Sequence, residues 1–150
     1  MTPISPGRTL QLTKPSARRS EPTRGPRIRI GTNGIVADVL IDTDLFVDHL
    51  RGSNELKPGR DRVHYSVITR AELFAGTSAT DLVTTLLAPF REILVDRFIA
   101  ERAGRVRRDA GIRLPDALIA ATALEHGLIM KTRNRRDFDR VPGLRVRSPR

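Results

Sequence analysis

The 150-residue sequence contains no cysteine and no tryptophan, and only 4% of its residues are aromatic. Without cysteine there is no disulfide framework and no thiolate metal site. The core must be built mainly from aliphatic side chains and alanine, and the 39% hydrophobic content suffices for one domain. No apolar run approaches the roughly 18 residues of a membrane helix, and no secretory segment follows the first Met. These absences favour a reduced, cytoplasmic, globular protein without a membrane segment.

Lysine is also scarce, because 3 lysines stand against 24 arginines in a chain of net charge +10. Such basicity indicates a polyanionic partner, either a nucleic acid or an acidic protein surface. A GC-rich genome is an equally open explanation of the excess of arginine over lysine. The charge is uneven: residues 1–35 carry a net +6 and residues 36–150 only +4. Charge alone therefore does not identify a nucleic-acid enzyme.

The first part of the chain is rich in proline and has no apolar periodicity. Residues 1–34 hold five of the ten prolines, and such a segment buries too little surface to offset its ordering entropy. We therefore divide the chain into a disordered basic extension, residues 1–35, and a folded domain, residues 36–148. The extension is either a basic arm that touches nucleic acid or sequence translated from a misplaced start.

Beyond this extension, short apolar strands alternate with helical patterns. Strands are predicted at residues 36–41, 63–68, 93–95, 128–130 and 144–146, and helices at residues 44–50, 69–74, 81–90, 99–110 and 114–126. The helix that follows the second strand is predicted to begin at a Thr69 N-cap, with Glu72 completing a capping box. This alternation is typical of an α/β fold with a central, mainly parallel sheet.

Four acidic residues stand out by their positions, although each has an ordinary explanation. Asp42 suits a turn after the first strand, and Glu72 suits the capping box. Asp116 complements the N-terminus of its helix, and Asp137 suits a solvated loop.

The joint placement of these acids indicates more. Asp42 ends the first strand, Glu72 and Asp137 follow later strands, and Asp116 begins a helix, so all four are expected at one end of the sheet. Carboxylates gathered there repel one another unless a cation neutralises them, and hard divalent ions prefer oxygen ligands. The pattern predicts an acidic pocket for Mg²⁺ or Mn²⁺, which activates water for phosphodiester hydrolysis.

Several blocks of the sequence resemble the PIN-domain ribonucleases of the VapC type, which are toxins of toxin–antitoxin pairs. The blocks are Val39-Leu-Ile-Asp-Thr-Asp-Leu-Phe-Val-Asp-His-Leu-Arg-Gly52, Ser66-Val-Ile-Thr-Arg-Ala-Glu72-Leu, Leu114-Pro-Asp-Ala-Leu-Ile-Ala-Ala-Thr-Ala123, Thr132-Arg-Asn-Arg-Arg-Asp-Phe138 and Val141-Pro-Gly-Leu-Arg-Val146. Together they cover residues 36–146 in order, and the third and fourth blocks are the most specific.

The resemblance implies a PIN-like α/β/α sandwich and an Mg²⁺- or Mn²⁺-dependent endoribonuclease. The expected catalytic residues are Asp42, Glu72, Asp116 and Asp137; of these, Asp42, Asp116 and Asp137 are the expected metal ligands. The pocket is expected to be lined by Thr43, Asp44, Thr132 and Asn134. The implied partners are an RNA substrate, a second copy of the chain, and a small antitoxin that inserts Arg or Lys near the acids.

Two features depart from the family pattern: the N-terminal extension, since relatives generally begin just before the first strand, and the residue that precedes Thr132. Lys131 stands where PIN-domain toxins usually carry an apolar or small residue. We expect its side chain to point outward rather than toward a phosphate.

Two other functions remain open at this point. Asp42-Thr-Asp44 resembles the Asp-x-Asp box of phosphatases, in which Asp42 would be the nucleophile, Asp44 the general acid and Lys131 a candidate phosphate ligand. Alternatively, the chain is a non-catalytic basic module that binds nucleic acid or a protein through its arginines. Nuclease assays with and without EDTA discriminate between these functions.

Overall fold

The computed structural model describes residues 28–31 and 34–149. These residues form a six-stranded sheet with the order β4-β3-β2-β5-β6, and β1 pairs with β2 outside this order. The strands are β1 (Ile28–Gly31), β2 (Gly34–Ile41), β3 (Arg62–Ser66), β4 (Arg91–Ile93), β5 (Ile129–Lys131) and β6 (Val146–Arg147). Only β1 is antiparallel to its neighbour, so the predicted mainly parallel sheet is confirmed.

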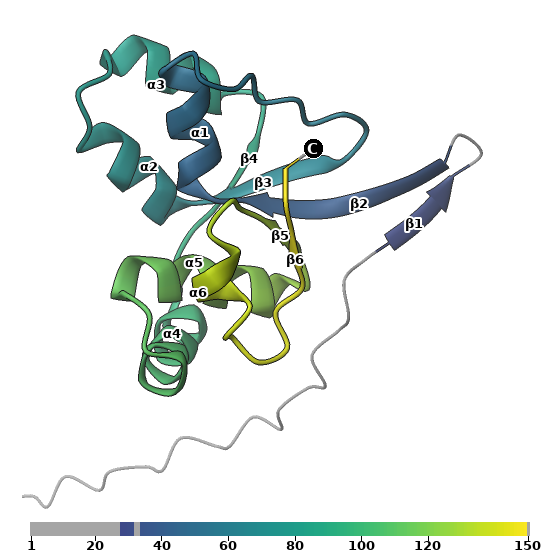
Figure 1. Cartoon of the computed structure of the whole chain (residues 1–150), viewed down its shortest axis with the longest axis vertical. Helices are drawn as coiled ribbons and strands as arrows, with labels where there is room; N and C mark the ends of the chain where they lie inside the picture. Colours follow the sequence, from purple (N-terminus) through teal and green to yellow (C-terminus); the bar gives the residue numbers. More distant parts are fainter. Residues whose placement is uncertain (1–27, 32–33, 150) are drawn as a thin grey trace, which may run out of the picture.

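Helices cover both faces of this sheet (Figure 1). They are α1 (Thr43–Leu50), α2 (Val67–Phe74), α3 (Thr80–Leu87), α4 (Arg97–Ala110), α5 (Leu114–His126) and α6 (Arg135–Phe138). Because side chains alternate along a strand, Val39 and Ile41 of β2 pack with α1, α2 and α3, whereas Leu40 packs with α4 and α5. The result is the expected α/β/α sandwich. Along the described part of the chain, no helix has the length and apolar content to cross a bilayer.

Helix α5 has the range that its sequence predicts. Pro115 lies in its first turn, where a missing N–H costs nothing. It ends at Gly127, which adopts a left-handed conformation with φ of 61° that L side chains rarely adopt. The alanines of α5 are buried on nearly every side of the helix, because α5 packs against both α4 and the sheet. This packing holds the N-terminal turn of α5, and Asp116 with it, in a fixed position.

Residues 28–31 correct one expectation. They were assigned to the disordered extension, but they form β1, which pairs with β2 from Ile28↔Ala37 to Gly31↔Gly34. Ile30 and Ile35 face each other across this hairpin and are 84% and 63% exposed. Residues of an exposed hairpin do not alternate between buried and exposed positions. The sequence pattern that predicts a buried strand therefore begins only near Val36. Residues 1–27 lie outside the described part of the chain.

The start of α2 also differs from its prediction. Ser66 is the N-cap, and its hydroxyl accepts a hydrogen bond of 3.2 Å from the backbone N–H of Ile68. Thr69 is therefore inside the helix and fully buried, and Glu72 lies in the second turn. The capping-box explanation of Glu72 is wrong, since no N-cap lies three residues before it.

Candidate active site

Asp42 is the first residue after β2 and the N-cap of α1. It is 5% exposed, and its carboxylate accepts a hydrogen bond of 2.8 Å from the backbone N–H of Thr43. A helix N-terminus stabilises an adjacent anion, which gives this buried carboxylate a fixed orientation. The neighbouring strand also holds the position, because the N–H of Asp42 donates to the carbonyl of Lys131 at 3.0 Å.

Thr132, which follows β5, connects Asp42 and Asp44 to Asp137 of α6. Its buried hydroxyl donates to Asp42 Oδ2 at 2.8 Å and lies 3.3 Å from Asp44 Oδ2. The same hydroxyl accepts from the backbone N–H of Asn134 at 2.9 Å. Asn134 Nδ2 in turn donates to Asp137 Oδ2 at 2.9 Å. Three acids and two polar side chains that were predicted to share a pocket therefore form one hydrogen-bonded network.

The electrostatics of this network leave negative charge without full compensation. Burial, followed by the charges of Asp44 and Asp116, raises the pKa of Asp42 to about 7, despite the hydrogen bonds from Thr132 and Thr43. Burial also raises the pKa of Asp44, although the backbone N–H of Arg133 donates to its Oδ2 at 2.9 Å. Asp44 Oδ1 is buried with no hydrogen-bond partner. Ionising both carboxyls is therefore costly unless a cation approaches.

Glu72 joins the site through Thr43 rather than through the helix N-terminus. The hydroxyl of Thr43 donates to Glu72 Oε2 at 2.5 Å. Thr69 Oγ1 lies 3.1 Å from the same hydroxyl, so α1 and α2 are joined by a chain of hydroxyl groups beside Asp42. Thr69 was missed as a site residue because its place in the sequence resembled an N-cap.

Asp116 enters the site from the first turn of α5. It is 7% exposed, and Arg113 Nε donates to its Oδ2 at 3.1 Å. This contact with Asp116, strengthened by the charges of Glu72 and Asp137, raises the pKa of the Arg113 guanidinium. Arg113 is thus close to three of the four predicted acids. Arg113 was not predicted as a site residue, although its position three residues before Asp116, at the start of a helix, was a signal.

The predicted acids therefore meet at one end of the sheet in three groups. Asp42, Asp44 and Asp137 are linked through Thr132 and Asn134; Glu72 is linked through Thr43; Asp116 is paired with Arg113. Within the described residues, no three His, Cys, Asp or Glu side chains are close enough together to hold a metal ion as they stand. The donors are nevertheless all oxygen atoms, and the orphaned Asp44 Oδ1 and the raised pKa of Asp42 both fit a hard divalent cation.

Lys131 does not point outward as predicted. Its Nζ bonds Asp61 Oδ2 at 2.7 Å, and its side chain is 19% exposed. The carboxylate of Asp61 also accepts from the N–H of Ala37 at 3.2 Å. Lys131 is therefore held beside β2, in an ion pair with a residue 70 positions earlier, which no local pattern indicates.

Comparisons with known proteins give a consistent result. The sequence matches the PIN domain family over residues 39–144. It is 37% identical over 120 residues to ribonuclease VapC19 of Mycobacterium tuberculosis, an alignment that covers 70% of this chain and 95% of that protein.

Solved structures resemble the fold as well. A toxin–antitoxin complex from Klebsiella pneumoniae has a chain with a TM-score of 0.64 and 32% identity, covering 75% of this chain and 98% of that one. VapBC-5 of Mycobacterium tuberculosis, described as a member of the VapBC family of toxin–antitoxin systems, has a TM-score of 0.56 and 25% identity, with 75% and 98% covered. Every acid described above lies within the matched residues.

Proposed function

Because this chain belongs to the PIN domain family, as its resemblance predicted, we propose that it is a divalent-metal-dependent endoribonuclease and the toxin of a toxin–antitoxin pair. One observation carries the proposal: Asp42 and Asp44, after the carboxyl end of β2, share the hydroxyl of Thr132, after the end of β5, in a chain 37% identical to a ribonuclease. A parallel sheet binds its ligands at this end. Placing the buried carboxyl of Asp42 beside the half-buried carboxyl of Asp44 is too costly to serve stability, which indicates a functional site.

Asp42, Asp116 and Asp137 would hold the metal, and Glu72 would ligate it or position water. The bound Mg²⁺ or Mn²⁺ would lower the pKa of water and stabilise the charge that develops on the phosphoryl oxygens. The chain itself orients these acids. Thr132 holds Asp42 at 2.8 Å, and Thr43 holds Glu72 at 2.5 Å.

The negative charge of these acids also suggests how a partner protein would inhibit the site. An antitoxin would silence the site by inserting Arg or Lys among the acids, because a guanidinium can bond the carboxylate oxygens bidentately. Arg113 already bonds Asp116 from within the chain, through one nitrogen, its Nε. We place the reaction in the cytoplasm, where cellular RNA is the substrate, and we propose a homodimer as the assembly.

The two alternative functions are less well supported. A phosphatase built on Asp42 and Asp44 would need a lysine beside the substrate phosphate, and Lys131 is instead engaged with Asp61. A non-catalytic basic module would have no use for a buried Asp42 carboxyl beside a half-buried Asp44 carboxyl, each with a raised pKa.

The test is cleavage of single-stranded RNA by the purified protein in Mg²⁺ or Mn²⁺, with EDTA as the metal-free arm. Asp42→Asn and Asp116→Asn should each lower the rate by about 10²-fold or more, the usual scale for one lost catalytic group. Asp109→Asn is the matched control, because Asp109 is an exposed acid of α4. Cleavage that persists in EDTA, or full activity of both site variants, would contradict the proposal. Induction in cells should arrest growth with the wild type and not with Asp116→Asn.

A further inference from the structure

Arg113 is an exposed arginine at the edge of the buried acids. It is the residue before α5, and 79% of its side chain is exposed, whereas Asp116 and Asp42 are buried. The charges of Asp116, Glu72 and Asp137, which come from α5, α2 and α6, all act on its guanidinium. A molecule that approaches Asp116 from solvent therefore meets Arg113 at the surface first.

The ion pair with Asp116 engages only part of the guanidinium. Nε of Arg113 donates to Asp116 Oδ2 at 3.1 Å. Within the residues that the structure describes, neither Nη1 nor Nη2 of Arg113 makes a hydrogen bond. A guanidinium has five N–H donors in a rigid planar fork, of which this bond uses one. Asp116 thus restrains the direction of the group and leaves both Nη atoms to a ligand.

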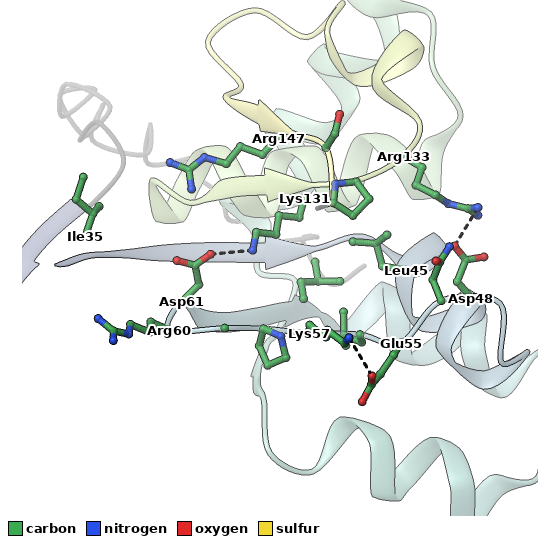
Figure 2. A pocket seen from close by; sticks show the side chains of 17 residues that line it. Ile35, Leu45, Asp48, Glu55, Lys57, Arg60, Asp61, Lys131, Arg133 and Arg147 are labelled. Carbon is green, nitrogen blue, oxygen red and sulfur yellow. Dashed lines mark hydrogen bonds and ion pairs between the residues drawn. The ribbon is translucent and has the colours of Figure 1, made fainter. Parts of the chain in front are cut away.

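Arg133 also forms an ion pair with an acid of the site, but its guanidinium is held between two carboxylates. Its Nη1 lies 2.9 Å from Asp48 Oδ2, and its Nε lies 3.8 Å from Asp44 Oδ2. Figure 2 shows this side chain reaching Asp48 of α1, beside a cavity that both residues line. The Nη atoms of Arg133 are therefore directed to α1, whereas those of Arg113 are open at the edge of the site.

The N-terminus of α5 favours an anion beside Arg113. This helix has 13 residues, and no side chain caps its first turn. The backbone N–H groups of an uncapped first turn carry partial positive charge, and phosphates often bind there. Leu114 in this turn is 49% exposed, so the turn is open to solvent. The acid of the turn, Asp116, is the one that Arg113 already pairs with.

Phosphate is the anion that fits this arrangement best. The planar fork of arginine binds two phosphate oxygens through parallel N–H bonds. A phosphate bound by the Nη atoms of Arg113 would lie beside Asp116, because Nε of the same guanidinium is 3.1 Å from that carboxylate. A phosphodiester placed next to an acid of a nuclease site is the one that is cleaved.

We propose that Arg113 binds the scissile phosphodiester of single-stranded RNA through its Nη atoms while its Nε stays on Asp116. Asp116 then orients Arg113, and Arg113 stabilises the negative charge that develops on the phosphoryl oxygens. The proposal deepens the proposed function, on which it rests, by adding a basic residue to the four acids.

The first test is steady-state cleavage of single-stranded RNA, with Mn²⁺ at a concentration that saturates each variant. Arg113→Gln should lower kcat by about 10²-fold, the usual effect of losing one donor to the transition state. Arg113→Lys keeps the charge but loses the planar fork, so it should recover only part of the lost rate.

The second test is RNA binding, which needs no metal in the site. Anisotropy of a short fluorescent single-stranded RNA is measured at several salt concentrations, in EDTA and in the Asp42→Asn background, so that no RNA is cleaved. Arg113→Gln should lower the slope of log K against log salt by about 0.7, which corresponds to about fivefold weaker binding at 0.1 M salt. Arg113→Lys should keep the slope, because it keeps one ionic contact.

Arg62→Gln is the matched control. Arg62 bonds the buried carboxylate of Asp38 at 2.7 Å, and it begins β3, at the opposite end of the sheet from the acids. If Arg113→Gln has the same salt slope as Arg62→Gln while circular dichroism shows both folded, the proposal is overturned, even if kcat falls, because Arg113 would then act on the acids alone. A wild type that cleaves no RNA but binds it through Arg113 overturns only the nuclease function.

Discussion

Replacing Asp42 by Asn should make the metal-free protein more stable. The folded-state pKa of Asp42 is about 7 against an ordinary 3.8, because burial and then the charges of Asp44 and Asp116 disfavour the ionised form. Asn retains the shape and the acceptor for the N–H of Thr43. Its amide can donate to Thr132 Oγ1, whose own hydrogen can then turn to Asp44.

The sign and size of the effect follow from linkage. A carboxyl whose pKa is raised on folding is ionised only at a cost, so it lowers the free energy of unfolding as the pH rises from about 4 to 7. Each pH unit in this window costs up to about 1.4 kcal/mol. The penalty is therefore about 2 kcal/mol at pH 5 and about 4 kcal/mol at pH 8, and Asp42→Asn should relieve it.

Urea unfolding in EDTA at both pH values measures this difference. Asp61→Asn is the informative control, because its pKa shifts the other way: burial would raise it, but the bonds from Lys131 and Ala37 N–H outweigh burial and lower it. Asp61 therefore stabilises the protein above its unfolded pKa, and this contribution is lost as the pH falls through its folded value. Its loss should destabilise the protein at pH 8. A gain for Asp42→Asn that is equal at pH 5 and pH 8, or a loss at pH 8, would refute the electrostatic reasoning.

Three further predictions concern other parts of the molecule. Arg113→Gln should tighten Mn²⁺ binding severalfold in a calorimetric titration, because it removes a cation bonded to Asp116; the exposed Arg108→Gln should not, and equal affinities would exclude competition. Thr132→Val should lower the free energy of unfolding by about 1–3 kcal/mol, because the acceptors of its hydroxyl lose their donor. Thr132→Ser should restore this stability, and an unchanged stability of the Val variant would show that the hydroxyl contributes none. Deleting residues 1–33, with the exposed strand β1, should lower the melting temperature by only a few degrees, and loss of cooperative unfolding would assign that segment to the folded domain.

The parts of the fold that the sequence predicted well are those with local causes. Helix α5 has a local signal at each end, Pro115 in its first turn and Gly127 after its last turn. Its predicted range, residues 114–126, is the observed one. The first parallel strand was predicted to end at Ile41, because an apolar run stops there at an acid. Since the carboxyl ends of parallel strands share one edge, the convergence of the acids followed from these assignments.

The features that were missed depend on partners far along the chain. Strand β1 exists through its pairing with β2, and Lys131 bonds Asp61 across 70 positions. The start of α2 was placed three residues late because both Ser66 and Thr69 are good caps, and only packing buries the second. Local preference and tertiary contact disagree at such positions, and contact decides.

The distribution of cations around the acids explains why a basic protein would depend on a positive group from outside. Arg133 is paired with Asp44 and Asp48, and Arg113 with Asp116. The carboxylate of Asp42 is instead bonded to an N–H and a hydroxyl, which carry no net charge. Its neighbours therefore orient the carboxylate without neutralising it. A divalent ion or an inserted guanidinium would gain the most at this one residue, so the metal and the silencing partner would compete for it.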